Sequence, residues 1–167
     1  MIDRYQFETI IYSTLEYMDA TMGIPATINA SKLLLFTAVV ESNAGTYLKQ
    51  IYGPAMGVYQ MEPATFNDIF KNYLKSKPKY LEVIQTVFPG CDEKIDVTED
   101  NTLHPLVTDL MFQTVMARIH YRRDRYSLPD WKDEEALWEY YKRVWNTYEG
   151  KAEKEECLRK WREYTDG

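Results

Sequence analysis

The sequence has 167 residues, of which 45% are hydrophobic and 28% charged. This length and balance favour one folded domain that buries roughly two-thirds of the surface of the unfolded chain, and they exclude a fibrous or disordered protein. The net charge of −6 speaks against a general nucleic-acid binder, which needs a positive field to displace the counterions of phosphate. The longest apolar stretch, Leu33–Val40, is far too short to span a membrane.

Cysteine and histidine are scarce. Cys91 and Cys157 are too few and too far apart for a disulfide framework, and His104 and His120 add no metal-ligand spacing. We therefore expect no metal and no cofactor. The N-terminus lacks the basic-then-apolar order of a signal peptide, so we expect synthesis in the cytoplasm and no membrane insertion.

The apolar periodicity is helical almost throughout. A first helix presents one apolar face over residues 7–18, with Asp3 as a candidate cap before it and Gly23 at its end. A second helix is predicted from about Ser31 to Ser42. It is apolar on every side, which is typical of a helix at the centre of a core.

The helical signal fails from Asn43 to Met61, where three glycines and a proline predict a loop. Residues 57–61 could form a short strand within it. Pro63 then occupies a position typical of the first residue of a helix.

The second half of the chain continues the helical pattern. We expect a short helix after Pro78, an acidic loop over Pro89–Thr102, a long helix over Pro105–Tyr121, another over Leu137–Tyr148 and a short one over Leu158–Tyr164. The sequence thus predicts one all-α or α-dominated domain over residues 1–167. Six or more helices would surround a central buried helix, with a short irregular or β-hairpin insert.

Glu41 is the anomaly of the sequence, because it follows eight almost wholly apolar residues on the same helix. Poor solvation disfavours the charged form of a carboxyl and raises its pKa. A carboxylic acid that stays protonated near neutral pH is what glycosidic cleavage needs, since the leaving oxygen must be protonated. The alternative is that Glu41 merely ends the helix and points to water.

The residues after Glu41 carry a resemblance. Four elements follow in order within 25 residues: Glu41-Ser42, the glycines Gly53 and Gly57, Gly57-Val58-Tyr59-Gln60, and Pro63-Ala64-Thr65. This order resembles the lysozyme-like lytic transglycosylases, and most closely the murein hydrolases that tailed bacteriophages carry in their virions. The matching core spans about residues 30–150.

A weaker match lies downstream. Ala117 and Tyr121 are similar to an alanine-tyrosine helix motif of the family, spaced one residue wider. Trp145, Asn146 and Tyr148 are similar to a later stretch that lines the cleft, with tryptophan in the place of a tyrosine. Alternatively, Trp145 and Tyr148 belong only to the apolar stripe of their helix.

The resemblance implies one catalytic acid. Glu41 would protonate the oxygen between N-acetylmuramic acid and N-acetylglucosamine, then accept the proton of the muramic 6-hydroxyl as a 1,6-anhydro ring closes. Gln60 would hydrogen-bond the sugar, Tyr59 would offer a stacking face, and Ser42 would orient the carboxyl or cap the helix. Tyr121, Trp145, Asn146 and Tyr148 would line the cleft.

Two further carboxylates leave open whether the product has a 1,6-anhydro ring or a reducing end. Glu62 or Asp68, if either faced Glu41, could hold a water and give ordinary muramidase hydrolysis. We expect Glu62 to lie near a helix N-terminus instead, where the helix dipole favours it. The partner would be the glycan strands of bacterial peptidoglycan, reached from a virion or at lysis, by a monomer or a part of a larger phage assembly.

Two rival functions remain. One is a non-catalytic murein-binding or virion module that kept the fold. The other is a nucleic-acid-binding helical protein that uses the basic run Arg118–Arg125. We expect this run to be a helix C-terminus whose cations lie in solvent.

Overall fold

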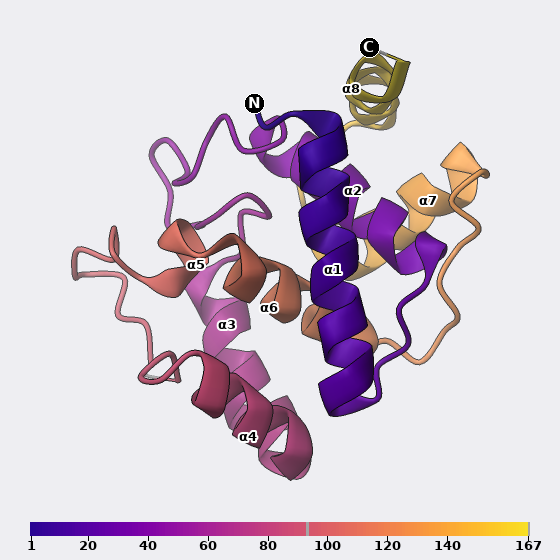
Figure 1. Cartoon of the computed structure of the whole chain (residues 1–167). Helices are drawn as coiled ribbons and strands as arrows, with labels where there is room; N and C mark the ends of the chain where they lie inside the picture. Colours follow the sequence, from indigo (N-terminus) through magenta and orange to yellow (C-terminus); the bar gives the residue numbers. More distant parts are fainter. Residues whose placement is uncertain (93, 167) are drawn as a thin grey trace.

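The computed structural model describes residues 1–92 and 94–166. Within these residues the fold is all-α, as the sequence predicts, and it has eight α-helices and no strand (Figure 1). The helices are α1 (Arg4–Met22), α2 (Ile28–Ser42), α3 (Pro63–Asp68), α4 (Pro78–Val87), α5 (Pro105–Thr108), α6 (Leu110–Arg122), α7 (Glu134–Tyr141) and α8 (Lys154–Asp166). A π-helical turn (Ile69–Tyr73) and a 3-10 turn (Leu74–Ser76) extend α3, and a π-helical turn (Lys142–Asn146) extends α7.

Helix α1 has the ends that the sequence predicts. The Asp3 side chain accepts a hydrogen bond from the Gln6 backbone N–H at 3.0 Å. At the other end Gly23 adopts the left-handed conformation with a φ of 70°, which costs glycine little. The buried face of α1 packs on α2 and α6.

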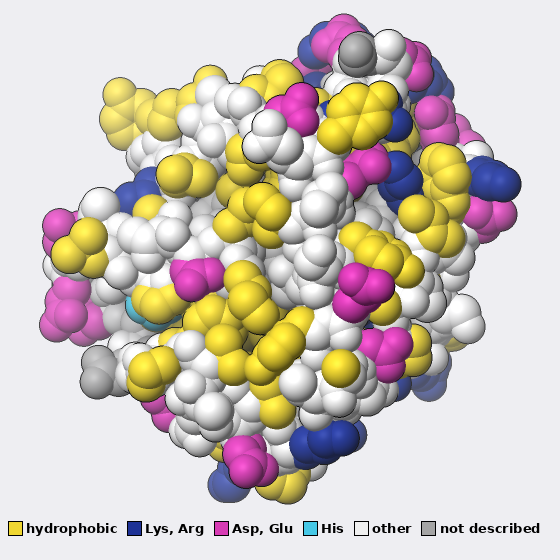
Figure 2. All heavy atoms as spheres, in the orientation of Figure 1, with side chains coloured by type: hydrophobic (Ala, Val, Ile, Leu, Met, Phe, Trp, Pro, Cys, Tyr) yellow, Lys and Arg dark blue, Asp and Glu magenta, His cyan; other side chains and the backbone are white. Residues whose placement is uncertain are grey.

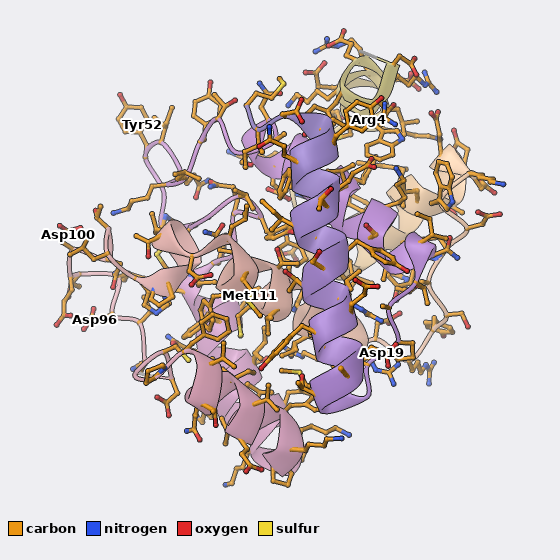
Figure 3. The ribbon with its side chains drawn as sticks, in the orientation of Figure 1. Arg4, Asp19, Tyr52, Asp96, Asp100 and Met111 are labelled. Carbon is orange, nitrogen blue, oxygen red and sulfur yellow. The ribbon has the colours of Figure 1, made fainter. Side chains whose placement is uncertain are left out.

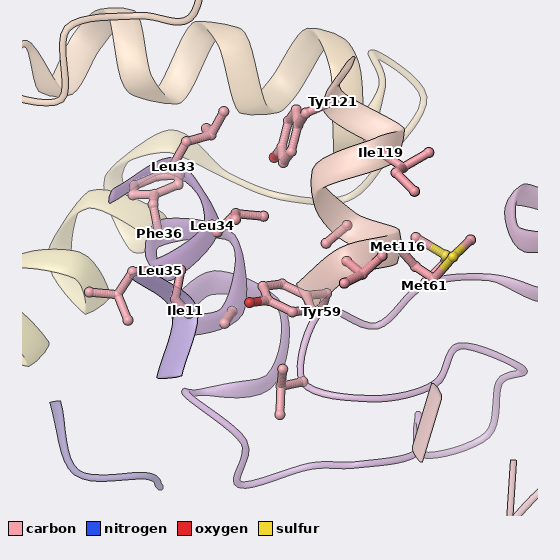
Figure 4. Packing of buried hydrophobic residues seen from close by; sticks show 14 of the residues in the cluster. Ile11, Leu33, Leu34, Leu35, Phe36, Tyr59, Met61, Met116, Ile119 and Tyr121 are labelled. Atoms are coloured by element: carbon pink, nitrogen blue, oxygen red, sulfur yellow. The ribbon is translucent and has the colours of Figure 1, made fainter. Parts of the chain in front are cut away.

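Helix α2 is the centre of the core. Every residue from Ala30 to Val40 is buried, and α2 contacts α1, α6, α7 and α8. Figure 4 shows Leu34 of α2 among buried side chains that include Tyr59 and Tyr121. The helix starts at Ile28, three residues earlier than predicted, because Thr27 caps it by accepting a hydrogen bond from the Ala30 N–H at 3.1 Å.

The segment between α2 and α3 is irregular. Its pairing consists of isolated bridges from Met56 to Lys49 and to Met61, so the short strand suggested for residues 57–61 is wrong. The cause is a tight turn: Gly57 and Gln60 both have positive φ, and the Gln60 N–H bonds the Gly57 carbonyl at 3.1 Å. A strand cannot continue through such angles.

The long helix predicted over residues 105–121 is two helices. Asp109 is extended between α5 and α6, with φ −119° and ψ 107°, and its carboxylate accepts a hydrogen bond from the Phe112 N–H at 2.8 Å. The helix predicted over residues 137–148 is likewise too long, because the chain turns at Thr147 with a φ of 64°. Tyr148 therefore lies outside it.

The acidic loop predicted over residues 89–102 forms turns, apart from residue 93, which lies outside the described residues. Asp96 and Asp100 each accept hydrogen bonds from a threonine two residues later, and Figure 3 shows both at the edge of the molecule. Figure 2 shows charged side chains scattered over one face with apolar ones between them. In the part of the chain that the structure describes, no helix is long and apolar enough to cross a membrane.

The basic run at the end of α6 is not wholly in solvent. Arg122, Arg123 and Arg125 are exposed, but Arg118 is only 5% exposed. The expectation that all these cations lie in water is therefore wrong for Arg118, whose side chain is buried.

Candidate active site

A groove of about 770 Å³ opens at the C-terminal end of α2. One wall is the loop before α3, a second is the π-helical turn after α7 with the segment that follows it, and a third is α8. The residues that line it include Val40, Glu41, Ala55, Gln60, Met61, Glu62, His120, Tyr141, Trp145, Asn146, Glu149, Glu156 and Lys160. The groove is thus assembled from segments up to 120 residues apart.

Glu41 is one of the residues that line this groove. Its carboxyl is mostly buried, and the Tyr141 hydroxyl donates a hydrogen bond to Oε1 at 2.6 Å. Burial raises the pKa of Glu41 to about 7, more than the Tyr141 hydrogen bond and the charge of Lys160 lower it, and the charge of Glu62 adds to the rise. The carboxyl can therefore both donate and accept a proton near neutral pH.

Tyr141 is a site residue that the sequence analysis counted only as part of an apolar stripe. Its ring is fully buried, edge-on to Phe36 of α2 with 5.5 Å between ring centroids. A buried tyrosine hydroxyl needs a hydrogen-bond partner, and Glu41, 100 residues earlier, supplies it. The stripe reveals that Tyr141 faces the core, but only the packing of α7 on α2 identifies the partner.

Gln60 lines the same groove as Glu41, as the resemblance implies. Its Nε2 donates to the Gly57 carbonyl at 2.8 Å, which holds the side chain beside its own turn. Gly57 has a φ of 78°, and a Cβ there would lie 2.1 Å from the Leu106 carbonyl oxygen. Only glycine fits this close approach, so Gly57 fixes the turn that presents Gln60.

Ser42 does not line the groove. It is fully buried, and its Oγ lies 2.6 Å from the Val58 carbonyl, to which it donates, and accepts a hydrogen bond from the Gly45 N–H at 2.8 Å. Of the two predicted roles, the geometry matches the capping of the helix end. Ser42 joins the end of α2 to the loop that carries Gln60.

Replacement of Ser42 by alanine should lower the free energy of unfolding by about 2 kcal/mol, because the half-buried Gly45 N–H and the buried Val58 carbonyl both lose a hydrogen-bond partner. Urea denaturation measures this loss. Ser76→Ala, which removes an exposed hydroxyl, serves as the control and should change stability by less than about 0.5 kcal/mol. Equal effects of the two variants would contradict the linking role of Ser42.

Tyr59 and Tyr121 are each only 1% exposed. The Tyr59 hydroxyl bonds Thr114 at 3.0 Å, and the Tyr121 hydroxyl bonds Thr37 at 2.7 Å. Neither residue lines the groove, so the predicted stacking role of Tyr59 and the predicted cleft-lining role of Tyr121 do not match this structure. Both rings instead pack against Trp145. The centroids of the Tyr59 and Tyr121 rings lie 6.3 and 5.2 Å from the centroid of the Trp145 ring.

Trp145 and Asn146 do line the groove. The Trp145 ring packs edge-on against His120, with 4.9 Å between centroids, and Lys142 donates to the Asn146 Oδ1 at 2.7 Å. Tyr148 is 81% exposed, lies past the end of the turn and is not among the groove residues. Of the three residues similar to the family's later cleft-lining stretch, the structure brings Trp145 and Asn146 to the groove.

The two additional carboxylates lie in different places. Glu62 is the N-cap residue of α3, as expected from the helix dipole, and it also lines the groove. Asp68 lies outside the groove and forms an ion pair with Arg123 at 2.5 Å. Of these two carboxylates, Glu62 is therefore the one that can affect the chemistry at Glu41.

Helix α8 supplies charged groove residues that the sequence analysis missed. Lys160 and Glu156 both line the groove, and the charge of Lys160 favours the ionised form of Glu41. The apolar stripe of α8 predicts its buried side but not which of its polar residues meet the end of α2. Among the described residues, no group of histidine, cysteine and carboxylate side chains is arranged to hold a metal ion.

Comparison of the chain with protein-family models, with curated proteins and with solved structures gives no match.

Proposed function

We propose that this protein is a peptidoglycan lytic transglycosylase that cleaves the β-1,4 bond between N-acetylmuramic acid and N-acetylglucosamine. The observation that carries the proposal is the Glu41 carboxyl, whose pKa is raised to about 7 where it faces a groove of about 770 Å³. Gln60 and Trp145 line the same groove and suit hydrogen bonding to a sugar and packing against its ring.

The proposed reaction uses Glu41 twice. The neutral carboxyl donates its proton to the bridging oxygen as the bond from that oxygen to the muramic C1 breaks. The resulting carboxylate takes the proton of the muramic 6-hydroxyl, whose oxygen forms the new bond to C1. No water is consumed, and the substrate acetamido group can stabilise the cationic sugar, so the mechanism needs no second carboxylate.

Tyr141 has a defined part in this cycle. Its hydroxyl donates to the Glu41 Oε1, and a hydrogen bond to a carboxylate is stronger than one to a neutral carboxyl. Tyr141 therefore stabilises Glu41 after proton donation, when the groove holds the positively charged sugar. It acts through Glu41 and is a positioning residue.

The order of elements supports a lysozyme-like arrangement. The central helix α2 ends at the proposed acid, a glycine-containing turn presents Gln60, and Pro63 opens the next helix. This is the order that the resemblance implies for residues 30–65. The single catalytic domain over residues 1–167 is part of the same proposal.

Hydrolysis by water is the second candidate, and the position of Glu62 favours it. Glu62 lines the groove, and its charge acts on Glu41. A carboxylate on the far side of the sugar could activate a water molecule and give a reducing end. Glu62→Gln should then abolish cleavage, whereas a transglycosylase would retain it.

Mass spectrometry of the products tests the proposal. Purified peptidoglycan incubated with the protein should release muropeptides with 1,6-anhydro ends, lighter by one water than reducing ends. Reducing ends would establish hydrolysis instead. Binding to peptidoglycan without any release would identify a non-catalytic module and overturn both enzymatic readings.

The pH dependence of kcat/KM should reveal the role of Tyr141. Because the acid must be protonated, we expect kcat/KM to fall as the pH rises through about 7. In Tyr141→Phe the carboxylate loses a hydrogen-bond donor, so the pKa of Glu41 rises and the alkaline limb moves to higher pH. Tyr148→Phe, which changes an exposed hydroxyl, should leave the profile in place, and an unmoved limb in Tyr141→Phe would refute this role.

A further inference from the structure

A second cavity of about 310 Å³ lies at the opposite end of α2. Thr27 and Asn29 at the start of α2, Arg118 and Arg122 of α6, and Tyr140 of α7 line it. Thr27 and Glu41 are 14 residues apart on one helix, which places this cavity about 21 Å along α2 from the proposed acid. It is separate from the groove that the proposed glycan cleavage uses.

Arg118 is the unusual residue of this cavity. The side chain is only 5% exposed, and its Nε has no hydrogen-bond partner. None of the ion pairs in the described part of the chain includes Arg118. A guanidinium keeps its proton in proteins, and a buried charge without a partner destabilises the fold.

The groups around Arg118 do not offset its charge. Burial and the charge of Arg122 both lower the pKa of Arg118, and the other titratable groups that face it are the hydroxyls of Tyr140, Tyr73 and Tyr80. Tyrosine is neutral at pH 7. Two arginines thus share one cavity, and their repulsion would be relieved by an anion.

Asp124 is the carboxylate that lines this cavity, and a different arginine already binds it. Both nitrogens at the end of the Arg143 side chain bond the Asp124 carboxylate, at 2.8 and 3.0 Å. This ion pair lowers the pKa of Asp124, which keeps the group charged and paired. The positive charge of Arg118 therefore remains uncompensated.

The start of α2 adds hydrogen-bond donors. The Thr27 Oγ1 accepts from the Ala30 N–H, so its own hydrogen is available, and the Asn29 Oδ1 accepts from the Trp131 N–H at 3.2 Å, which leaves its amide nitrogen to donate. The positive end of the dipole of this 15-residue helix lies at the same place.

We propose that this cavity binds an oxyanion, a phosphoryl or carboxylate group of a small molecule, with Arg118 as the main partner and Arg122 and the start of α2 as further contacts. The volume of about 310 Å³ is roughly ten times the share of one water molecule in the liquid, so it also admits an organic group beside the anion. Tyr126 and Tyr140 provide apolar surface for that group. The proposal does not depend on the function of the groove.

Thermal unfolding with inorganic phosphate tests the site. At constant ionic strength maintained with chloride, phosphate at 100 times its Kd should raise the unfolding midpoint of the unmodified chain by about 5 to 10 °C. Arg118→Met should abolish this rise. Without phosphate, Arg118→Met should melt at a higher temperature than the unmodified chain, because it removes an unpaired buried charge.

One further variant within the cavity and one control variant outside it complete the test. Arg122→Gln, at an exposed position of the cavity, should weaken phosphate binding severalfold in calorimetry without loss of folding. Lys75→Met removes an exposed cation that does not line the cavity and should leave the phosphate response unchanged. A parallel titration with acetate ranks carboxylate against phosphate.

Each possible outcome either supports or overturns the proposed anion site. A response to phosphate or acetate that Arg118→Met removes and Lys75→Met keeps supports the site. If neither anion shifts the midpoint of the unmodified chain, or if Arg118→Met responds equally, the proposal is overturned. Both readouts are independent of peptidoglycan cleavage, so failure of the proposed function does not affect them.

Discussion

Glu41→Gln should reduce kcat for glycan cleavage at least 100-fold, because general acid catalysis contributes about 10²- to 10⁴-fold to such a reaction. Glutamine has nearly the shape of glutamic acid, and its carbonyl oxygen can still accept the Tyr141 hydrogen bond. The groove should therefore keep its form and its affinity for glycan. The loss should appear in the chemical step alone.

The measurement is the rate at which soluble muropeptides leave purified peptidoglycan, together with the fraction of protein that sediments with it. Glu99→Gln is the matched control, since it makes the same chemical change at an exposed position outside the groove. It should cleave at the rate of the unmodified chain. If Glu41→Gln cleaved equally fast, Glu41 could not be the acid.

The same substitution should stabilise the fold at pH 8 by about 3 kcal/mol. The pKa of Glu41 is about 7 in the folded protein, against an ordinary value of 4.5 for glutamate in an unfolded chain. As the pH rises from 4.5 to 7, the unfolded chain releases this proton and the folded chain keeps it, so the free energy of unfolding falls. Above pH 7 the full loss of stability is present, which is about 1.4 kcal/mol for each unit of difference between the pKa values of the folded and unfolded chain. The glutamine side chain has no proton to release, so Glu41→Gln avoids this loss of stability.

Urea denaturation at pH 4, 6 and 8 measures this effect. The two proteins should have similar stability at pH 4, and the advantage of Glu41→Gln should grow toward pH 8. Glu99→Gln should show no such growth. An advantage that does not vary with pH would mean that burial does not raise the pKa of Glu41. A gain in stability with a loss of activity is typical of a residue kept for function.

The parts of the fold that depend on neighbouring residues could be predicted from the sequence. The ends of α1 follow from Asp3 and Gly23, and the burial of α2 follows from an apolar run with no polar face. The break at Asp109 was missed because the apolar spacing continues across it, although aspartate is a good N-cap. Periodicity shows which residues face the core but not where a helix is interrupted.

The candidate site also contains some residues that the sequence predicts and others that depend on how the helices pack. Glu41 and Gln60 were found because they lie close together in the chain, and both line the groove. Tyr141 and Lys160 were missed because their relation to Glu41 depends on how α7 and α8 pack against the end of α2. Tyr59 was assigned to the surface because a tyrosine suits both a core and a sugar site, and only burial distinguishes the two.

The π-helical turn that extends α7 sets the direction of one groove wall. Its hydrogen bonds join residues five apart instead of four, so each residue advances through a smaller angle around the axis than in an α-helix. The same five residues wound as a regular α-helix would place Trp145 and Asn146 at different angles around the axis. Their presence in the groove thus depends on how a single turn is wound, while α7 itself could stay intact.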